Sequence, residues 1–227
     1  TYVSGSTTLG ESTAQLNGAT VAIIEGYTSI GSSAFSGASG LTSIEIPAGV
    51  TSIGIYAFYG ALGLTSVTFP QNSLLTSIKE SAFSGAFRNA RGLTSIEIPA
   101  GVTSIGFRAF SEASGLTSVT FPQNSLLTSI GYSAFSGASG LTSIEIPPSV
   151  TSIERFTFYG TSLTSIAIPA SVTSIEIYAF AQASGLTSIT FPQDSLLTSI
   201  GSNAFYYASG LTSIAIPPSV TSIGDQA

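Results

Sequence analysis

The sequence contains no cysteine, histidine, methionine or tryptophan, and only five lysines and arginines among its 227 residues. Without cysteine the chain forms no disulfide framework, no thiolate metal site and no thiol nucleophile. Without histidine it lacks both a Ser-His-Asp triad and an imidazole base. The net charge is −6. We therefore expect no nucleic-acid partner, because phosphate backbones bind clustered lysine and arginine.

Long apolar runs are also missing. Polar Thr-Ser pairs interrupt every apolar stretch, and none approaches the roughly 20 residues that a membrane helix needs, so we expect no membrane insertion. No Asp-rich loop has the spacing of a calcium site, and we expect neither a metal nor a cofactor. Only 7% of the residues are charged while 43% are hydrophobic, which is enough for a core.

What the sequence has in abundance is one repeated phrase. "LTSIEIPAGVTSIG" occupies residues 41–54 and returns at residues 93–106. Most units are 23 residues long, and they begin at Gly18, Leu41, Leu64, Leu93, Leu116, Leu141, Leu163, Leu186 and Leu211. One unit cannot bury its apolar side alone, but stacked units can. Residues 18–227 therefore predict a solenoid of about nine units with a truncated last unit, and residues 1–17 are interpreted as an N-terminal cap or linker.

Each unit predicts two short parallel strands, about 4.8 Å from those of the next unit. In "LTSIEIP" the alternation places Ile44 and Ile46 inward and Glu45 outward. In "VTSIG", Val50 and Ile53 point inward. The "YAFYGA" segment that follows is too short for a free-standing helix, and we predict a single α or 3₁₀ turn there.

Stacking also brings one phenylalanine per unit into register. The predicted buried spine consists of Phe35, Phe58, Phe83, Phe110, Phe135, Phe158, Phe180 and Phe205. The spine explains the repetition, because each coil needs inward residues that match those of its neighbours.

The spaced "LTSI.IP", "VTSIG" and "AF.G" blocks of residues 18–227 resemble the BspA-like leucine-rich repeats of bacterial surface proteins and some protists. The resemblance implies a leucine-rich-repeat solenoid that is curved and right-handed, with parallel strands on its concave side. It also implies an extracellular or cell-surface location and a role in adhesion or binding. Family members often carry cysteine after "AF.G", where this chain has alanine, or threonine at Thr161.

Recurrent acids and threonines were weighed as functional sites. Glu45, Glu97 and Glu145 alternate with threonines, so adjacent acids lie about 10 Å apart, just beyond the separation that inverting glycosidases use. We interpret them as solvated residues and the protein as a non-enzyme. The threonine columns, for example Thr94, Thr117 and Thr142, resemble ice-binding faces. Because they lack a T-x-T pair, side-to-side hydrogen bonding of threonines is the favoured interpretation.

The repeats disagree mainly just before and after "AF". This stripe is rich in tyrosine and arginine, which are enriched at binding hot spots, although a side that tolerates any residue would vary too. The candidate ligand surface consists of Tyr56, Tyr59, Arg88, Arg91, Phe107, Arg108, Tyr132, Arg155, Phe156, Tyr159, Tyr178, Tyr206 and Tyr207.

The predicted function is a non-enzymatic, cell-surface or secreted module that binds an extracellular protein or glycan. The alternative is a structural module that self-associates through the solenoid ends into fibres, because repeat arrays need polar caps to stay soluble and the last unit is incomplete. Ice binding is the least favoured prediction.

Overall fold

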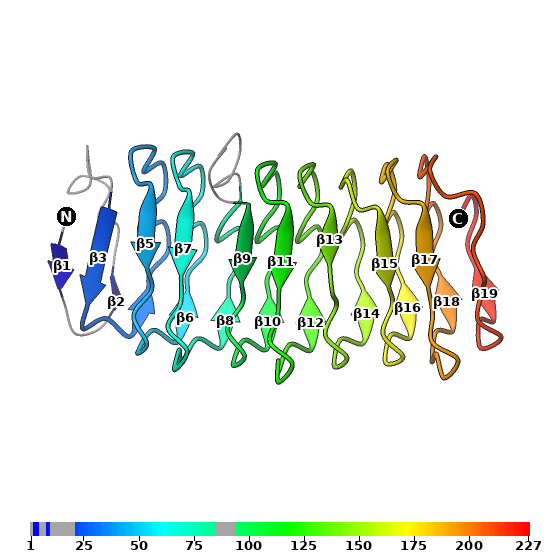
Figure 1. Cartoon of the computed structure of the whole chain (residues 1–227), viewed down its shortest axis with the longest axis horizontal. Helices are drawn as coiled ribbons and strands as arrows, with labels where there is room; N and C mark the ends of the chain where they lie inside the picture. The colour runs from blue at the N-terminus through cyan, green and yellow to red at the C-terminus, as the bar shows by residue number, and fades with distance from the viewer. Residues whose placement is uncertain (1, 5–7, 10–20, 85–93) are drawn as a thin grey trace.

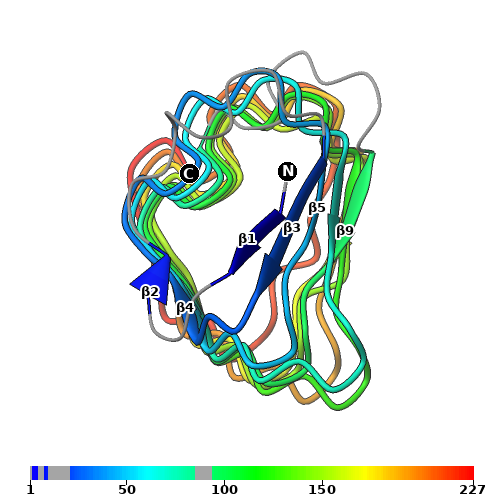
Figure 2. The same ribbon diagram turned by 90° about the vertical axis from the view of Figure 1, so that its left-hand side faces the viewer.

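The chain folds into a solenoid whose coils follow one another along one long axis (Figure 1). The computed structural model describes residues 2–4, 8–9, 21–84 and 94–227. These residues form nineteen strands and no helix. Seen along the axis, the coils superimpose around a common interior, with β3 and β5 on one side and β2 and β4 on the other (Figure 2). The predicted parallel-strand solenoid is confirmed.

The "LTSI" strands form the first sheet face. All pairings are parallel and in register, so that Ile44 lies opposite Val67 and Ile96 opposite Val119. Ladder bonds join the strands in three groups, β1-β3-β5-β7, β9-β11-β13 and β15-β17. The strands are β1 (Tyr2–Ser4), β3 (Val21–Glu25), β5 (Ser43–Glu45), β7 (Ser66–Thr68), β9 (Ser95–Glu97), β11 (Ser118–Thr120), β13 (Ser143–Ile144), β15 (Ser165–Ala167) and β17 (Ser188–Thr190).

The "VTSIG" segments form the second sheet face from shorter strands. Their isoleucines again face their counterparts, as Ile30 does with Ile53 and Ile53 with Ile78. The strands are β2 (Thr8–Leu9), β4 (Ser29–Ile30), β6 (Ser52–Ile53), β8 (Ser77–Ile78), β10 (Ser104–Ile105), β12 (Ser129–Ile130), β14 (Ser152–Ile153), β16 (Ser174–Ile175), β18 (Ser199–Ile200) and β19 (Ser222–Ile223).

Hydrogen-bonded turns, rather than a helical turn, follow each strand of the second face. We call the surface made by these segments, such as residues 31–41, the turn face. Within a coil, the Ala38 N–H donates to the Phe35 carbonyl. Between coils, the Phe35 N–H donates to the Ala57 carbonyl at 2.7 Å. The residue before the repeated Ala-Phe pair has a left-handed backbone conformation, as at Ser33 (φ 56°). A residue in this conformation interrupts a right-handed helix.

The phenylalanine spine forms the centre of the core. Consecutive rings stack with centroids 4.9–5.7 Å apart and planes within 15° of parallel. The rings from Phe35 to Phe180 are fully buried and Phe205 is partly buried. Ile44, Ile46, Val50 and Ile53 are buried as predicted. The predicted register of the repeats is confirmed.

The threonine columns are held by the backbone. In both columns a threonine hydroxyl donates to the main-chain carbonyl of the threonine one coil earlier, at 2.6–3.2 Å. Thr76, for example, donates to the Thr51 carbonyl and Thr103 to that of Thr76. These bonds run from side chain to main chain, and not between threonine side chains. The columns therefore join the coils to one another.

The described parts of residues 1–17 extend both sheet faces by one strand. Strand β1 pairs with β3, and β2 pairs with β4. The division of the chain at residue 17 into a cap or linker and a repeat array stays a prediction.

We expect Phe135→Ala to lower the free energy of unfolding by roughly 3–5 kcal/mol, the usual cost of a large-to-small change in a core. Phe135 is fully buried and stacks on Phe110 at 5.4 Å and on Phe158 at 5.7 Å. Denaturant unfolding measures the change. The exposed Gln123, changed to alanine, serves as the control and should shift stability by less than about 0.5 kcal/mol. If Phe135→Ala lowers the free energy of unfolding by less than about 1 kcal/mol, the phenylalanine spine does not stabilise the core as proposed.

Candidate binding surface

The structure gathers the described members of the predicted ligand surface on the turn face. Their backbone is fixed by bonds to the next coil. The Tyr56 N–H donates to the Glu80 carbonyl and the Arg108 N–H to the Tyr132 carbonyl, each at 3.1 Å. Arg88 and Arg91 lie outside the described residues. The turn face therefore presents side chains from a rigid backbone.

Five rings form a continuous aromatic track across five coils. Phe107 stacks on Tyr132 at 5.1 Å, and Phe156 stacks on Tyr178 at 4.9 Å. Edge-on contacts connect the pairs, from Tyr132 to Phe156 at 5.7 Å and from Tyr178 to Tyr206 at 6.4 Å. Such pairs stabilise each other beyond the area they bury. We call these five residues the aromatic track.

Two further tyrosines flank the track. Tyr159 meets Phe156 edge-on at 5.7 Å, and Tyr207 meets Tyr206 at 4.3 Å. The hydrogen bond with Tyr207 raises the pKa of the Tyr206 hydroxyl above its ordinary value, and the charge of Tyr207 adds to the effect.

Both described arginines of the surface lie on aromatic rings. The Cζ atom of Arg108 is 4.9 Å from the centroid of Phe107, and that of Arg155 is 6.0 Å from the centroid of Phe156. Both arginines are exposed. Among the described residues, no carboxylate forms an ion pair with either guanidinium. Cation–π contacts hold the two positive charges in place and leave their hydrogen-bond donors available.

Several of these side chains sit on strained backbone. Tyr56, Arg108, Phe156 and Tyr178 have φ between 53° and 58°, the left-handed region that costs an L-residue roughly 1–2 kcal/mol. Sister coils place small or amide residues there, such as Asn203. Bulky residues are genuine outliers in this conformation, and such strain clusters at functional sites.

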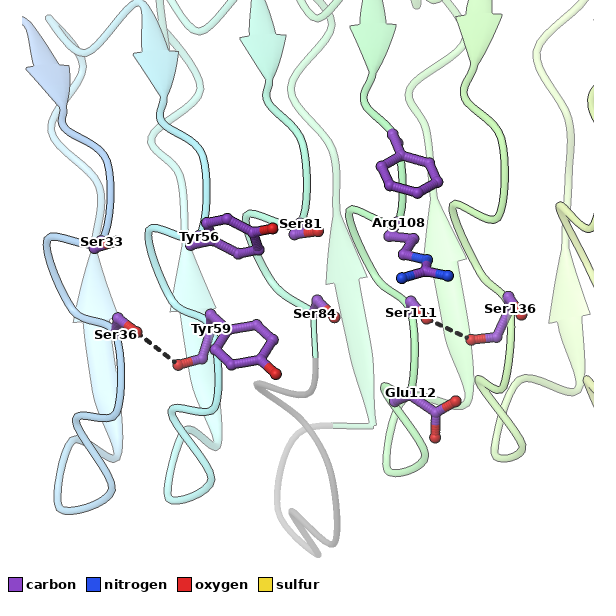
Figure 3. A pocket seen from close by; sticks show the side chains of 11 residues that line it. Ser33, Ser36, Tyr56, Tyr59, Ser81, Ser84, Arg108, Ser111, Glu112 and Ser136 are labelled. Carbon is purple, nitrogen blue, oxygen red and sulfur yellow. Dashed lines mark hydrogen bonds between the residues drawn. The ribbon is translucent and has the colours of Figure 1, made fainter.

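A recess lies where a coil with small side chains follows a coil with two tyrosines. Tyr56 and Tyr59 belong to one coil and contact each other edge-on at 5.5 Å. In the next coil the corresponding places hold Ser81 and Ser84, which form part of a recess of about 690 Å³. Figure 3 shows the two serines between the tyrosines and Arg108. The recess was not predicted from the sequence, because serine recurs at these two positions in several coils and gains significance only once neighbouring coils are placed side by side.

The first sheet face carries a row of outward acids, including Glu45 and Glu97, and the turn face carries others, such as Glu112 and Glu154. The outward Glu97 lies opposite Thr120 in the ladder, as the repeat predicts. Gln71 and Asn124, from two long loops, flank a groove of about 540 Å³ that includes Glu97. Across the described residues no three acidic side chains gather as a metal site would require. Nor does the part of the chain that the structure describes contain a helix long and apolar enough to cross a membrane.

Comparison with known proteins identifies the repeat. The profile of the BspA type leucine rich repeat region matches in six copies, over residues 14–124, 84–152 and 123–227. The chain belongs to the BspA-type leucine-rich repeat family. No curated protein matches the sequence significantly. The BspA-type repeat is a scaffold, so the chemistry of its members lies in the side chains that the scaffold displays.

Solved leucine-rich repeat structures share the fold of this BspA-type chain. A leucine-rich repeat protein from Bacteroides ovatus is 32% identical with a TM-score of 0.76, over 87% of this chain and 49% of that one. The chain thus spans about half the length of that protein. The leucine-rich repeat protein of T. pallidum is 22% identical with a TM-score of 0.57, over 84% of this chain and 76% of that one.

The backbone strain on the turn face can be measured at a position whose side chain is not aromatic. Gln182 is exposed with φ 59°, where four sister coils have Gly37, Gly60, Gly137 and Gly160 at positive φ. We expect Gln182→Gly to raise the free energy of unfolding by up to about 1 kcal/mol, because glycine is unstrained in this region. The matched change Gln123→Gly is at a residue without positive φ, and it should instead lower the free energy of unfolding slightly. Equal destabilisation by both changes would show that the left-handed backbone is not strained.

The chemistry of the surface predicts no hydrolysis. The chain has no histidine or cysteine, and its outward acids, such as Glu97, lie opposite threonines. We expect no turnover on a panel of glycan and peptide substrates. Turnover that disappears in Glu97→Gln but persists in Glu45→Gln would contradict this expectation.

Proposed function

We propose that this BspA-type repeat array is a non-enzymatic binding or adhesion module, displayed at the cell surface or secreted, which contacts a protein or glycan through the turn face. Family membership supports a scaffold that displays side chains, and the resemblance to repeats of bacterial surface proteins supports the location. The aromatic track supplies the contact area. Tyrosine and arginine give large buried area and directed hydrogen bonds at modest entropic cost.

The observation that carries the proposal is the strained backbone beneath the rings. Phe156 and Tyr178 occupy left-handed positions where Asn203 shows that a less strained residue fits the same coil geometry. Relaxed packing alone would favour such small or amide residues. A strained pair of rings that stack at 4.9 Å is instead the arrangement of a surface selected for contact.

The structure weighs against an ice-binding surface. An ice-binding face needs threonine hydroxyls that are free to order water. Eleven hydroxyls of the two columns donate to main-chain carbonyls, as Thr117 does to the Thr94 carbonyl at 2.6 Å. Their single donor is therefore used within the solenoid.

Fibre formation through the solenoid ends is the alternative function, and it predicts a different behaviour in solution. An end-stacking module grows in mass as its concentration rises, because exposed strands pair with another copy. Light scattering across a concentration series separates the two functions. A monomer at high concentration supports the binding module.

The decisive experiment compares two sets of substitutions in binding to a partner captured from a panel of extracellular-matrix proteins and glycans. Changing Tyr132, Arg155 and Tyr178 to alanine removes the middle of the track. We expect a loss of at least about tenfold in affinity, because aromatic and arginine anchors dominate interface energy.

The control set changes Thr94, Thr117 and Thr142 to valine, which keeps the branched shape and should leave affinity unchanged once folding is verified by circular dichroism. If the threonine set abolishes binding and the aromatic set does not, the partner binds the periodic ladder and the proposed surface is wrong.

A further inference from the structure

We infer that the recess over Ser81 and Ser84 binds a sugar unit that carries one carboxylate, as part of an acidic glycan. The inference rests on the proposed function, in which the turn face binds a partner, and it specifies the ligand for one place on that face. The recess lies beside the aromatic track and shares only Phe107 with it.

The recess exists because two serines of one coil lie between the tyrosines of the coil before and Arg108 of the coil after. Ser81 occupies the left-handed position that holds Tyr56 in the coil before and Arg108 in the coil after. Ser84 occupies the place of Tyr59 and Ser111. Ser81 is 3% exposed and Ser84 8% exposed, so they form a floor between the taller side chains (Figure 3).

The walls of the recess are held in place before any ligand arrives. The rings of Tyr56 and Tyr59 brace each other at 5.5 Å, and Phe107 stacks on Tyr132 at 5.1 Å. The backbone beneath is fixed, since the Ser81 N–H donates to the Phe107 carbonyl at 2.7 Å. A preorganised recess loses little entropy when a ligand binds.

Arg108 provides the anion-recognising group. Its guanidinium lies over the Phe107 ring at 4.9 Å, and no carboxylate of the described residues pairs with it. A guanidinium offers a planar fork of donors that matches a carboxylate. Glu112 bounds the recess beyond Ser111, on the side away from Arg108 (Figure 3). The two charges give the recess a direction, with room for one anionic group at the Arg108 end.

The remainder of the lining fits a polyol better than a peptide. Hydroxyls of serine and tyrosine both donate and accept hydrogen bonds, as the hydroxyls of a sugar do. A peptide bound as an added strand would need unpaired main-chain groups. Here the N–H groups of Tyr56, Ser81 and Arg108 already donate to the next coil. Recognition must therefore come from side chains, and most of these are hydroxyls.

The probe is a tetrasaccharide in which glucuronic acid alternates with N-acetylglucosamine. Its matched ligand has both carboxyls reduced to alcohols. We expect the acidic tetrasaccharide to bind in calorimetry or saturation-transfer NMR, and its affinity to fall by about tenfold or more on carboxyl reduction, as the loss of a charge-assisted hydrogen bond predicts.

Two pairs of variants locate the site. Arg108→Gln should reduce affinity as much as carboxyl reduction does, whereas Lys79→Gln, which removes an exposed positive charge outside the recess lining, should leave it unchanged. Ser81→Tyr should fill the recess and abolish binding. Tyr56 and Tyr178 show that the fold accepts tyrosine at this left-handed position. Asn203→Tyr adds a tyrosine at the same position of a distant coil and is the control.

Three outcomes would overturn the inference. The first is no binding of the acidic tetrasaccharide to the folded protein. The second is equal losses of affinity in Arg108→Gln and Lys79→Gln. The third is displacement of the sugar by a pentaglutamate peptide that binds more tightly at the same residues. The last outcome would assign the recess to a protein partner. Failure of the proposed function is distinguishable, because it can be measured with the Arg155 and Tyr178 changes alone, which leave the recess and the Tyr132 ring that braces Phe107 intact.

Discussion

The hydrogen bonds between neighbouring coils are the interaction on which the rest of the structure depends. Each coil has main-chain donors and acceptors along its whole length, and a buried unpaired group is costly. The strands of the two sheet faces satisfy them, and so do the turns, as in the bond from the Phe35 N–H to the Ala57 carbonyl. These bonds fix the register of every coil on the next. Like positions then meet, and a phenylalanine that stacks well in one coil requires a phenylalanine in the next.

This dependence explains which features could be predicted from the sequence. Inward residues such as Ile44 and Val50 follow from the repeat period, because register forces each to meet its own counterpart. The direction of the threonine bonds could not be predicted, since Thr76 satisfies its hydroxyl equally well on a side chain or on the Thr51 carbonyl. The left-handed backbone at Tyr56 was hidden as well. Its usual sequence signal is glycine, and no coil has glycine at that position.

The candidate surface was predictable as a stripe but not as a shape. Variation between units marks the residues that register does not constrain, and this reasoning identified Tyr132 and Arg155. It could not say that the rings form two stacked pairs joined edge-on, because that depends on side-chain directions in adjacent coils. Nor could the comparison of units show that the stripe of variable residues contains a recess at Ser81. A list of variable positions gives a small residue no significance, whereas in space it separates two walls.

The distribution of charge adds a consequence for how a partner approaches. The chain has net charge −6, and Glu45 and Glu97 stand outward on the first sheet face. In the proposed binding mode an acidic partner would be repelled there. On the turn face, which also carries acids such as Glu112 and Glu154, Arg108 and Arg155 would attract it locally. Such asymmetry orients an encounter and raises its rate more than its final affinity, over a range of about 8 Å at physiological salt. Because each arginine rests on a ring, the groups that orient the partner are also fixed at the place where the aromatic contacts form. In the proposed binding mode, local attraction by the arginines and contact with the rings would therefore act at the same place.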